Sequence, residues 1–176
     1  MRFPASPEEY WELLEAAEYR ADYYNHEIIA AMSYESQYHS DLASRLGHLL
    51  QNIFWNNPHF KVHNSNRPVC MPNCDHAVFN PDGSVVAQPA SLYEYRPGMN
   101  AELTPVLLFE VLSKSTRQYD YGEKLPCYKT IPSLRYILYL ESNRPEVTVF
   151  ERLPDTGQWL ETNLRNLDDV FLIEGQ

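Results

Sequence analysis

Glu110 stands in the middle of an apolar run, VLLFEVL at residues 106–112. As a strand, this run would place Val106, Leu108, Glu110 and Leu112 on one face, and Leu107, Phe109 and Val111 on the other. Because both faces are apolar, the run predicts a central strand that is buried on both sides. A buried, ionised carboxylate needs a cation, a network of hydrogen-bond donors or a raised pKa. Such acids gather at functional sites, although a strand-end acid that reaches solvent or pairs with one base would give the same pattern.

Two further residues suggest phosphate chemistry beside Glu110. Asp75 heads a short strand-like run at residues 74–79, and two acids on neighbouring strands can share Mg²⁺, which prefers hard carboxylate oxygens. Lys124 and Tyr128 are four residues apart and so share one helix face, with Ile131 close by. An inward lysine can orient a water and balance phosphate charge. Taken singly, however, Asp75 is also an ordinary turn acid and Lys124 an ordinary surface lysine.

The surrounding sequence predicts the elements that would position these residues. Ser6, Pro7 and Glu9 form the start of a helix with a capping box. Asn25-His26 predicts a tight hairpin between strands at 19–24 and 27–32, and a second helix is expected at about 36–56. We further predict strands at 60–64, 74–79, 106–112, 136–140, 147–151 and 158–162, a helix at 121–130, a turn at Asn80-Pro81-Asp82-Gly83 and irregular structure at 84–104. This order predicts an α/β or α+β domain, in which helices flank a mixed central β-sheet and an N-terminal helix and β-hairpin are added.

Composition limits the class of protein. The 176 residues, of which 44% are hydrophobic and 22% charged, predict one soluble domain over residues 1–176. We expect a cytoplasmic protein, because there is no membrane-spanning run, no signal core at the N-terminus and only three irregularly spaced cysteines, which fit reduced thiols. The net charge of −10 opposes broad electrostatic binding to nucleic acid, but residues 113–135 hold five bases and two acids. One local surface could therefore bind an anion.

A structural zinc site is an alternative use of the sulfur ligands. Cys70, Cys74 and His76 are close in sequence, and Cys127 could be the fourth ligand. The spacing Cys-x3-Cys-x-His does not repeat a standard ligand pair, which disfavours this reading. Nucleotide-binding glycine loops and the Gly-x-Ser-x-Gly elbow of serine hydrolases are absent from the sequence.

The pattern as a whole resembles the Uma-type restriction endonuclease family, long filed as a domain of unknown function, within the PD-(D/E)xK nuclease superfamily. The resemblance runs from about Arg20 to Glu151. Residues 20–33, RADYYNHEIIAAMS, resemble the entry hairpin of the family, and His39 stands where the family has a histidine that opens its second helix. Asp75 stands at the aspartate of the Pro-Asp motif. The most specific match is EVLSKST at 110–116 with Tyr119-Asp120 and Gly122-Glu123-Lys124, continued by IPSLRYILYL at 131–140.

This resemblance implies a restriction-endonuclease-like core and Mg²⁺-dependent hydrolysis of phosphodiester bonds in DNA, with Mn²⁺ as a substitute. It implies that Asp75 and Glu110 are catalytic metal ligands, helped by the main-chain carbonyl of Val111. Lys124 would be the catalytic lysine, because Leu112 stands at the usual lysine position. The resemblance also implies that Glu27 and His39 support the ligands. We expect DNA-backbone contacts from Lys114, Arg117 and Lys129, and a homodimer by analogy of fold.

Three departures from the family pattern bear on activity. Cys74 replaces the proline before the aspartate, His26 replaces the hairpin glycine, and Pro126 interrupts the helix that carries Lys124. They leave a second hypothesis open, in which the chain keeps the nuclease fold but acts as a binding or assembly module with little or no turnover.

Overall fold

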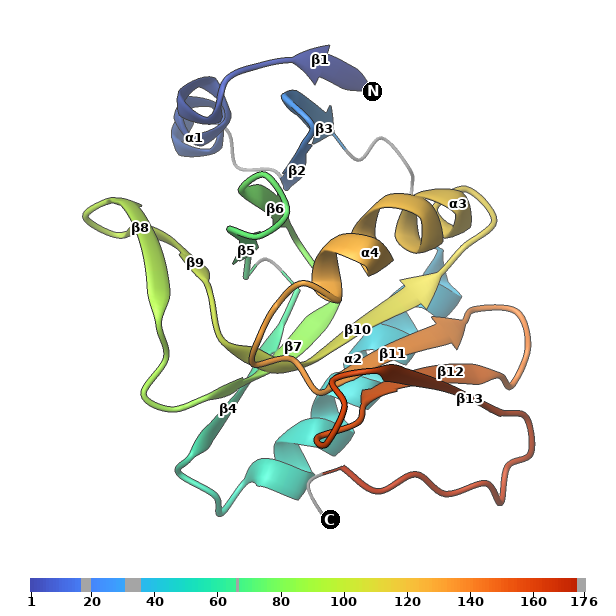
Figure 1. Cartoon of the computed structure of the whole chain (residues 1–176). Coiled ribbons are helices and arrows are strands. Elements are labelled where there is room, and N and C mark those ends of the chain that lie inside the picture. The colour runs from blue at the N-terminus through green and yellow to red at the C-terminus, as the bar shows by residue number, and fades with distance from the viewer. Residues whose placement is uncertain (17–19, 31–35, 66, 174–176) are drawn as a thin grey trace.

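The structure is a computed structural model, and it describes residues 1–16, 20–30, 36–65 and 67–173. Figure 1 shows the arrangement of its helices and strands. In chain order the elements are β1 (Arg2–Pro4), α1 (Pro7–Ala16), β2 (Ala21–Tyr24), β3 (Glu27–Ala30), α2 (Gln37–Phe54), β4 (Phe60–Asn64), β5 (Val69–Met71), β6 (Ala77–Phe79), β7 (Gly83–Ala87), β8 (Leu92–Arg96), β9 (Met99–Glu102), β10 (Pro105–Leu112), α3 (Arg117–Tyr119), the π-helical segment η1 (Asp120–Lys124), α4 (Leu125–Tyr128), β11 (Tyr136–Glu141), β12 (Val147–Arg152) and β13 (Trp159–Leu164).

The strands form two mixed sheets rather than the single central sheet that the sequence predicts. One has the order β1-β3-β2-β6-β5-β9-β8 and the other the order β13-β12-β11-β10-β7-β4. In the second sheet β10 pairs in parallel with β11 and antiparallel with β7. The mixed α+β class is therefore confirmed, with β10 as an inner strand.

All eight residues of β10 are buried, as its apolar pattern predicts. Leu107, Phe109 and Val111 pack in one core cluster with Leu50 and Phe54 of α2. The alternate residues Leu108 and Leu112 pack in another cluster with residues of α4, and Figure 1 shows α2 and the α3–α4 segment on opposite sides of β10. Glu110 belongs to the second set by alternation, so its side chain faces α3–α4.

The helix predicted at 121–130 is instead three consecutive helical segments, α3, η1 and α4. Its π-helical middle ends just before Pro126, and the amide of Leu125 donates to the carbonyl of Asp120, five residues back. Proline cannot donate an amide hydrogen bond and its ring crowds the preceding turn, so the sequence places a proline where the turn is already widened. The widened turn leaves both Asp120 and Lys124 buried.

The N-terminal elements follow their sequence signals closely. Ser6 and Glu9 form the capping box of α1, with hydrogen bonds of 3.2 and 2.7 Å between each side chain and the amide of the other residue. Asn25 and His26 both have positive φ, of 50° and 58°, as a two-residue hairpin turn between β2 and β3 requires. The predicted outer ends of these strands, residues 19 and 31–32, lie outside the described residues.

Residues 69–104 differ most from the expectation. The stretch expected to be irregular holds β7, β8 and β9, and β5 was not predicted. The strand expected at 74–79 is only β6, because residues 72–76 form turns in which Cys74 donates to Met71 and Ala77 donates to Cys74.

The cysteines also differ from the expected reduced thiols. Cys74 and Cys127 form a disulfide between this turn and α4, while Cys70 is buried and free. The disulfide removes two ligands from the zinc hypothesis.

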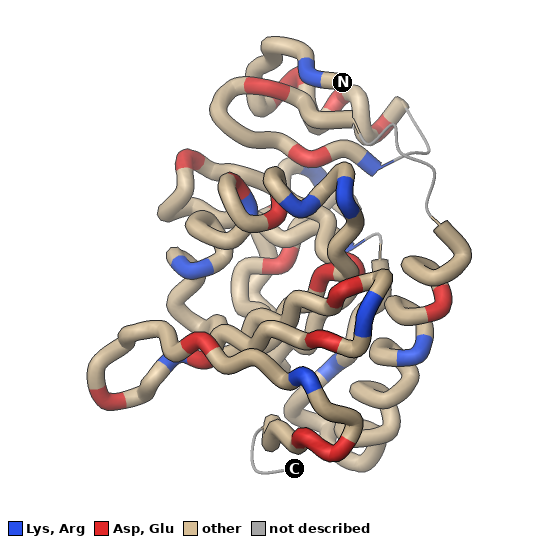
Figure 2. The backbone as a smooth tube through the Cα atoms, turned by 90° about the vertical axis from the view of Figure 1, so that its right-hand side faces the viewer, with Lys and Arg blue, Asp and Glu red and all other residues tan. Residues whose placement is uncertain are grey.

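The charges show no segregation to one side of the backbone, and acidic and basic positions are interspersed from one end of the molecule to the other (Figure 2). Within the part of the chain that the structure describes, we find no helix with both the length and the apolar character that crossing a bilayer requires.

Candidate active site

The register of β7 against β10 brings Asp82 level with Glu110. Gly83, the first residue of β7, pairs with Phe109, so Asp82 lies just before the strand and beside the continuation of β10. Strand β7 begins at Gly83, so it has no backbone carbonyl that could accept the amide hydrogen of Val111. The Asp82 carboxylate accepts that hydrogen instead, through Oδ2 at 2.8 Å. The other oxygen, Oδ1, lies 3.2 Å from Nε2 of His39 on the first turn of α2. Strand pairing and α2 thus hold Asp82 beside Glu110.

Glu110 is held by two donors from the helix that faces it. The Lys124 ammonium donates to Oε1 at 2.9 Å and the Tyr128 hydroxyl donates to the same oxygen at 2.7 Å. The carboxyl side chain of Glu110 is only 5% exposed. The four-residue spacing between Lys124 and Tyr128 therefore does what the helix pattern predicts, and places both side chains against the buried acid.

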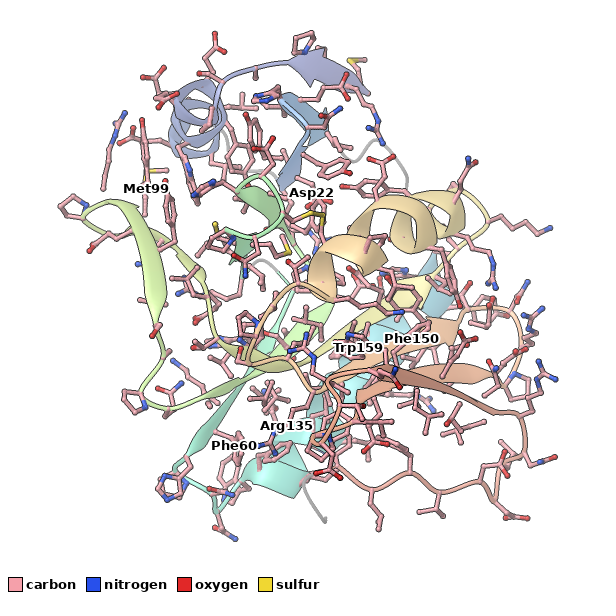
Figure 3. All side chains as sticks on the ribbon, viewed as in Figure 1. Asp22, Phe60, Met99, Arg135, Phe150 and Trp159 are labelled. Atoms are coloured by element: carbon pink, nitrogen blue, oxygen red, sulfur yellow. A yellow bond between two sulfur atoms is a disulfide. The ribbon has the colours of Figure 1, made fainter. Side chains whose placement is uncertain are left out.

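Two more acids surround the Lys124 ammonium. Its Nζ lies 3.7 Å from Oδ2 of Asp22 and 3.8 Å from Oδ1 of Asp120. Asp22 comes from β2 in the other sheet, and its Oδ2 accepts a hydrogen bond from the Tyr119 hydroxyl at 2.9 Å. Figure 3 shows the labelled Asp22 side chain between the N-terminal hairpin and the helix of α3–α4. The N-terminal sheet thus contributes an acid directly to the site.

Asp22 and Asp82 are linked through the same short segment, Asn80-Pro81-Asp82. The Asn80 amide donates to Oδ1 of Asp22 at 2.8 Å, and the Asn80 side-chain amide donates to it at 3.1 Å. A segment that reads as a turn in the sequence therefore fixes one acid through Asn80 and supplies a second acid itself.

Burial and mutual repulsion set the charge states of this cluster. Burial, together with the negative charges of Asp82 and Asp120, raises the pKa of Glu110 to about 8. Burial alone would lower the pKa of Lys124, but Glu110, Asp22 and Asp120 outweigh it and raise that pKa, so the ammonium stays charged. Burial opposes ionisation of Asp82 as well, yet the hydrogen bond from His39 and its positive field lower the pKa of Asp82. Burial raises the pKa of Asp120.

These side chains line one pocket of about 230 Å³. Its lining carries four acids against two cations, Lys124 and Arg20, so full ionisation would leave an excess of negative charge in a largely buried place. The loop after β10 also contributes hydroxyl groups to the lining of this pocket. The remaining lining residues include Arg20, Ile29, Ser36, Ser113, Ser115 and Thr116.

The structure assembles some of the residues proposed from sequence and separates others. Glu110, Val111, Lys124 and His39 all line the pocket. Asp75 does not: it lies in the turn before β6 with φ of 50°, its side chain is 65% exposed, and its carboxylate is 3.5 Å from Nε2 of His26. The acid beside Glu110 is therefore Asp82, which lies directly before β7.

Two other predicted residues lie away from this pocket. Glu27 on β3 pairs with Arg2 at 3.3 Å and is absent from the pocket lining. Lys129 lies over the rings of Phe150 and Trp159, which Figure 3 labels, at 4.7 and 5.9 Å from their centroids. Lys114 and Arg117 line a separate groove beside the site.

A signal for Asp82 was present in the sequence. Pro81-Asp82 is a literal Pro-Asp pair, whereas Asp75 follows Cys74. The surrounding Asn-Pro-Asp-Gly sequence also strongly favours a turn, so the Pro-Asp pair was interpreted as part of a turn and not as a site motif. Tyr119 and Asp120 lie in the segment that resembles the family most specifically, although they were not proposed as site residues. Asp22 carries no comparable motif of its own, because only the tertiary fold brings it to Lys124.

The chemistry of the donor set fits a hard divalent cation. Asp82 and Glu110 present carboxylate oxygens to one pocket, and Val111, whose amide points at Asp82, lines it as well. The excess of buried negative charge is a second reason for a cation to bind here. Among the described residues, no three side chains of His, Cys, Asp or Glu form a complete ligand set. Two carboxylates, a carbonyl and solvent would therefore share the coordination, as is usual for Mg²⁺.

The fold is shared with a solved structure. The structure aligns with a TM-score of 0.69 and 14% sequence identity to the crystal structure of a nuclease, described as putative and assigned to DUF820, from Anabaena variabilis ATCC 29413. The alignment covers 93% of this chain and 88% of the Anabaena chain.

The family follows from the sequence match. Residues 7–174 match the model of the family described as "Uma2: Putative restriction endonuclease", and the chain belongs to that family. The chain is also 31% identical over 167 residues to the uncharacterized protein slr1290 of Synechocystis sp. strain PCC 6803, covering 95% of this chain and 84% of that protein.

Proposed function

We propose that this protein is a Mg²⁺-dependent endonuclease that hydrolyses phosphodiester bonds in DNA. The observation that carries the proposal is the convergence of Asp82, Glu110 and Lys124 on one pocket, in a chain of the Uma2 family. Asp82, Glu110 and the carbonyl of Val111 would hold Mg²⁺, with Mn²⁺ as a substitute. When bound, the ion supplies Lewis-acid polarisation of the phosphate and of the attacking water.

The side chains of the protein have separate tasks in this reaction. Lys124 holds Glu110 in place at 2.9 Å, and its positive charge stabilises the negative charge that develops on the phosphate oxygens. His39 and the Val111 amide orient Asp82. The hydroxyls of Ser113, Ser115 and Thr116, at the pocket wall, can donate to neighbouring phosphate oxygens. Water adds to phosphorus in line with the 3′ oxygen, which leaves as a hydroxyl, so the products are a 5′-phosphate and a 3′-hydroxyl.

Cleavage of supercoiled plasmid DNA tests the proposal. We expect Mg²⁺-stimulated nicking that falls at least about a hundredfold in Asp82→Asn and in Glu110→Gln. Asp75→Asn is the matched control, because it makes the same change at an exposed acid outside the pocket. Wild-type nicking in Asp82→Asn together with its loss in Asp75→Asn would contradict the assignment of the site.

One observation favours the alternative of a binding module with little turnover. Both oxygens of Asp82 already have hydrogen-bonding partners, and Oε1 of Glu110 has two donors, so a cation must compete for these oxygens. Calorimetric titration with Mn²⁺ separates the two functions. A nuclease requires binding that Glu110→Gln abolishes, whereas the module predicts no detectable binding and no nicking.

We also propose that the protein acts as a homodimer in the cytoplasm. For dimerisation, the support is the exposed apolar group Leu49, Ile53 and Trp55 at the end of α2, with exposures of 57%, 42% and 79%. Sedimentation of the wild type and of Ile53→Asp tests this surface. The cytoplasmic location stays a prediction from the sequence, and the Cys74–Cys127 disulfide removes the support that reduced thiols would have given it.

A further inference from the structure

The loop that follows β10 is a wall between two hollows. Ser113, Ser115 and Thr116 line the candidate active site, whereas Lys114 and Arg117 line an open groove of about 660 Å³ on the other side. Hydrogen bonds within the loop hold its shape: the Ser113 hydroxyl lies 3.0 Å from the hydroxyls of both Ser115 and Thr116. A ligand bound at the active site has only this short wall to cross before it enters the groove.

The floor of the groove is the part of β12 and β13 that the α3–α4 helix leaves uncovered. Phe150 of β12 packs against Tyr121 and Tyr139 under the helix. Two residues earlier on the same face, Thr148 lines the groove, and its hydroxyl donates to Oδ1 of Asn163 on β13 at 2.8 Å. The groove floor is therefore polar at Thr148 and Asn163, with one acid, Glu161 of β13, whereas four acids line the pocket across the wall.

The rim of the groove is a chain of ion pairs in which each acid lies between two arginines. Glu141 pairs with Arg117 and with Arg144, and Glu146 pairs with Arg144 at 2.6 Å and with Arg165 at 3.3 Å. The two acids are nearly buried, with exposures of 10% and 15%, whereas the three arginines are 44%, 52% and 68% exposed. The acids thus hold the arginines from beneath, and guanidinium groups face the solvent.

This arrangement suits a polyanion. An arginine has five N–H donors, so each guanidinium that pairs with one carboxylate keeps donors for a phosphate. With Lys114, the groove has four cationic side chains against three acids, Glu146 and Glu161 in its lining and Glu141 in its rim, in a chain whose net charge is −10. The groove is thus a locally cationic surface beside a pocket that would otherwise repel a nucleic acid.

We propose that this groove binds the phosphate backbone of the DNA strand as it continues beyond the active site, with Arg144 and Arg165 as contact residues in addition to Lys114 and Arg117. The inference rests on the proposed nuclease function for its choice of ligand. The contacts are to phosphates, so the groove positions the strand and does not read its sequence. Nearly buried Glu141 and Glu146 act as positioning residues for the arginines.

Fluorescence anisotropy tests the groove without any need for cleavage. The probe is a labelled DNA duplex of about 20 base pairs, roughly two helical turns, titrated with protein in Ca²⁺ at several salt concentrations. We expect the double variant Arg144→Ala/Arg165→Ala to bind on the order of tenfold more weakly, with a salt slope reduced by about 2 because two phosphate contacts are lost. Arg144→Lys/Arg165→Lys keeps both charges and should retain most of the binding.

Two further variants separate a phosphate-binding groove from a general effect of charge. Arg96→Ala is the matched control, because Arg96 is also an exposed arginine paired with two acids, Glu12 and Glu15, but lies on β8. We expect it to bind as the wild type does. Glu146→Gln keeps a side-chain oxygen that can accept from Arg144 and Arg165 but removes one negative charge from the groove, so it should strengthen binding, whereas a role for Glu146 in stability alone would leave binding unchanged.

The inference is overturned if the double variant keeps the wild-type affinity and salt slope, or if Arg96→Ala weakens binding equally. These outcomes are distinct from failure of the nuclease proposal. A protein that binds DNA through the arginines but does not nick plasmid supports the groove and refutes the nuclease proposal. Plasmid nicking that is unchanged in Arg144→Ala/Arg165→Ala supports the nuclease proposal and refutes the groove.

Discussion

The carboxylate of Asp82 accepts the backbone hydrogen bond of Val111 at 2.8 Å, in the position that a further residue of β7 would otherwise occupy. One acid of the site is therefore fixed by the strand that carries the other, because Val111 directly follows Glu110. A side chain held to a neighbouring strand in this way has little freedom to move away from Glu110. The geometry of the acid pair is thus a consequence of sheet register, not of a flexible loop.

The pKa of Glu110 predicts how the stability of the metal-free protein depends on pH. Burial, with the charges of Asp82 and Asp120, raises this pKa to about 8 in the folded protein, from an ordinary value of 4.5 for a glutamic acid. Between these values the folded state holds a proton that the unfolded chain has lost, so the contribution of Glu110 to the free energy of unfolding decreases as pH rises from about 5 to about 8. Denaturant titrations in EDTA should show this decrease in the wild type and not in Glu110→Gln.

A surface acid serves as the control for that experiment. Asp75→Asn removes a carboxylate of which 65% is exposed, and its stability should follow the wild-type profile with pH. A Glu110→Gln protein whose stability falls with pH as steeply as the wild type would show that Glu110 does not hold the proton.

A second prediction concerns Tyr128. Tyr128→Phe removes the hydroxyl that donates to Glu110 at 2.7 Å, and we expect a loss of about 1–3 kcal/mol in the free energy of unfolding, since a buried acceptor loses a partner. Because the same bond orients Glu110, plasmid nicking should also fall. Tyr139→Phe is the matched control: Tyr139 neighbours Glu110 on the adjacent strand, but its buried hydroxyl donates to the backbone carbonyl of Asp120 at 2.7 Å and not to Glu110.

The two tyrosines should therefore separate stability from activity. We expect similar losses of stability in both variants, measured by urea denaturation, and a loss of nicking in Tyr128→Phe alone. Equal nicking by the two variants would mean that Tyr128 supports the fold without positioning the acid.

The parts of the site that depend on local periodicity were predictable from sequence. Alternation within residues 106–112 identified a strand with two buried faces and placed Glu110 on one of them. Helical spacing put Lys124 and Tyr128 on a common face, and the structure brings both to Glu110. These predictions need only neighbours within about two turns of a helix or a few residues of a strand.

The parts that depend on register between distant segments were not predictable in the same way. Asp82 reaches Glu110 because Gly83 pairs with Phe109, and Asp22 reaches Lys124 because the N-terminal sheet packs against the helix. Residues 80–83 have the composition of a turn, which predicts neither that Asn80 fixes Asp22 nor that Asp82 is an acid of the site. Strand β7 escaped prediction because four of its five residues are buried, so it has no alternation of polar and apolar side chains.

The disulfide leads to a third prediction. Cys74 and Cys127 are 53 residues apart in sequence, and the loop-entropy relation gives a stabilisation of about 4 kcal/mol for a crosslink that closes a loop of this size. Reduction with dithiothreitol should lower the free energy of unfolding by up to that amount. Because Cys127 directly precedes Tyr128, loosening α4 should reduce nicking as well.

Alkylation followed by mass spectrometry checks the state of the cysteines directly. Denatured, unreduced protein should take up one label, at Cys70, and reduced protein should take up three. Burial raises the pKa of the Cys70 thiol to about 11, so this residue should react slowly in the native protein. Three labels without reduction would show free thiols, which are the usual state in the cytosol.

The last prediction concerns Gly83, which lies between Asp82 and the sheet. A Cβ atom at this position would overlap the Phe109 ring and lie 3.1 Å from the carbonyl oxygen of His63. Gly83→Ala should therefore destabilise the protein by about 1–3 kcal/mol through overpacking, and should reduce nicking because a shift of the strand moves Asp82. Gly122→Ala is the matched control, since a Cβ atom there meets nothing within 4 Å.

A double variant shows whether the Phe109 ring is the cause. Phe109→Leu removes the edge of the ring, so Gly83→Ala should be less destabilising in that background than alone, and the two changes should be non-additive in denaturant titrations. Additive losses would mean that the clash of the new Cβ atom at position 83 with the backbone carbonyl of His63, and not with the Phe109 ring, causes the destabilisation. In either case Gly122→Ala should leave nicking unchanged, because the requirement for glycine at position 83 comes from the close approach of β10 and not from general intolerance of alanine.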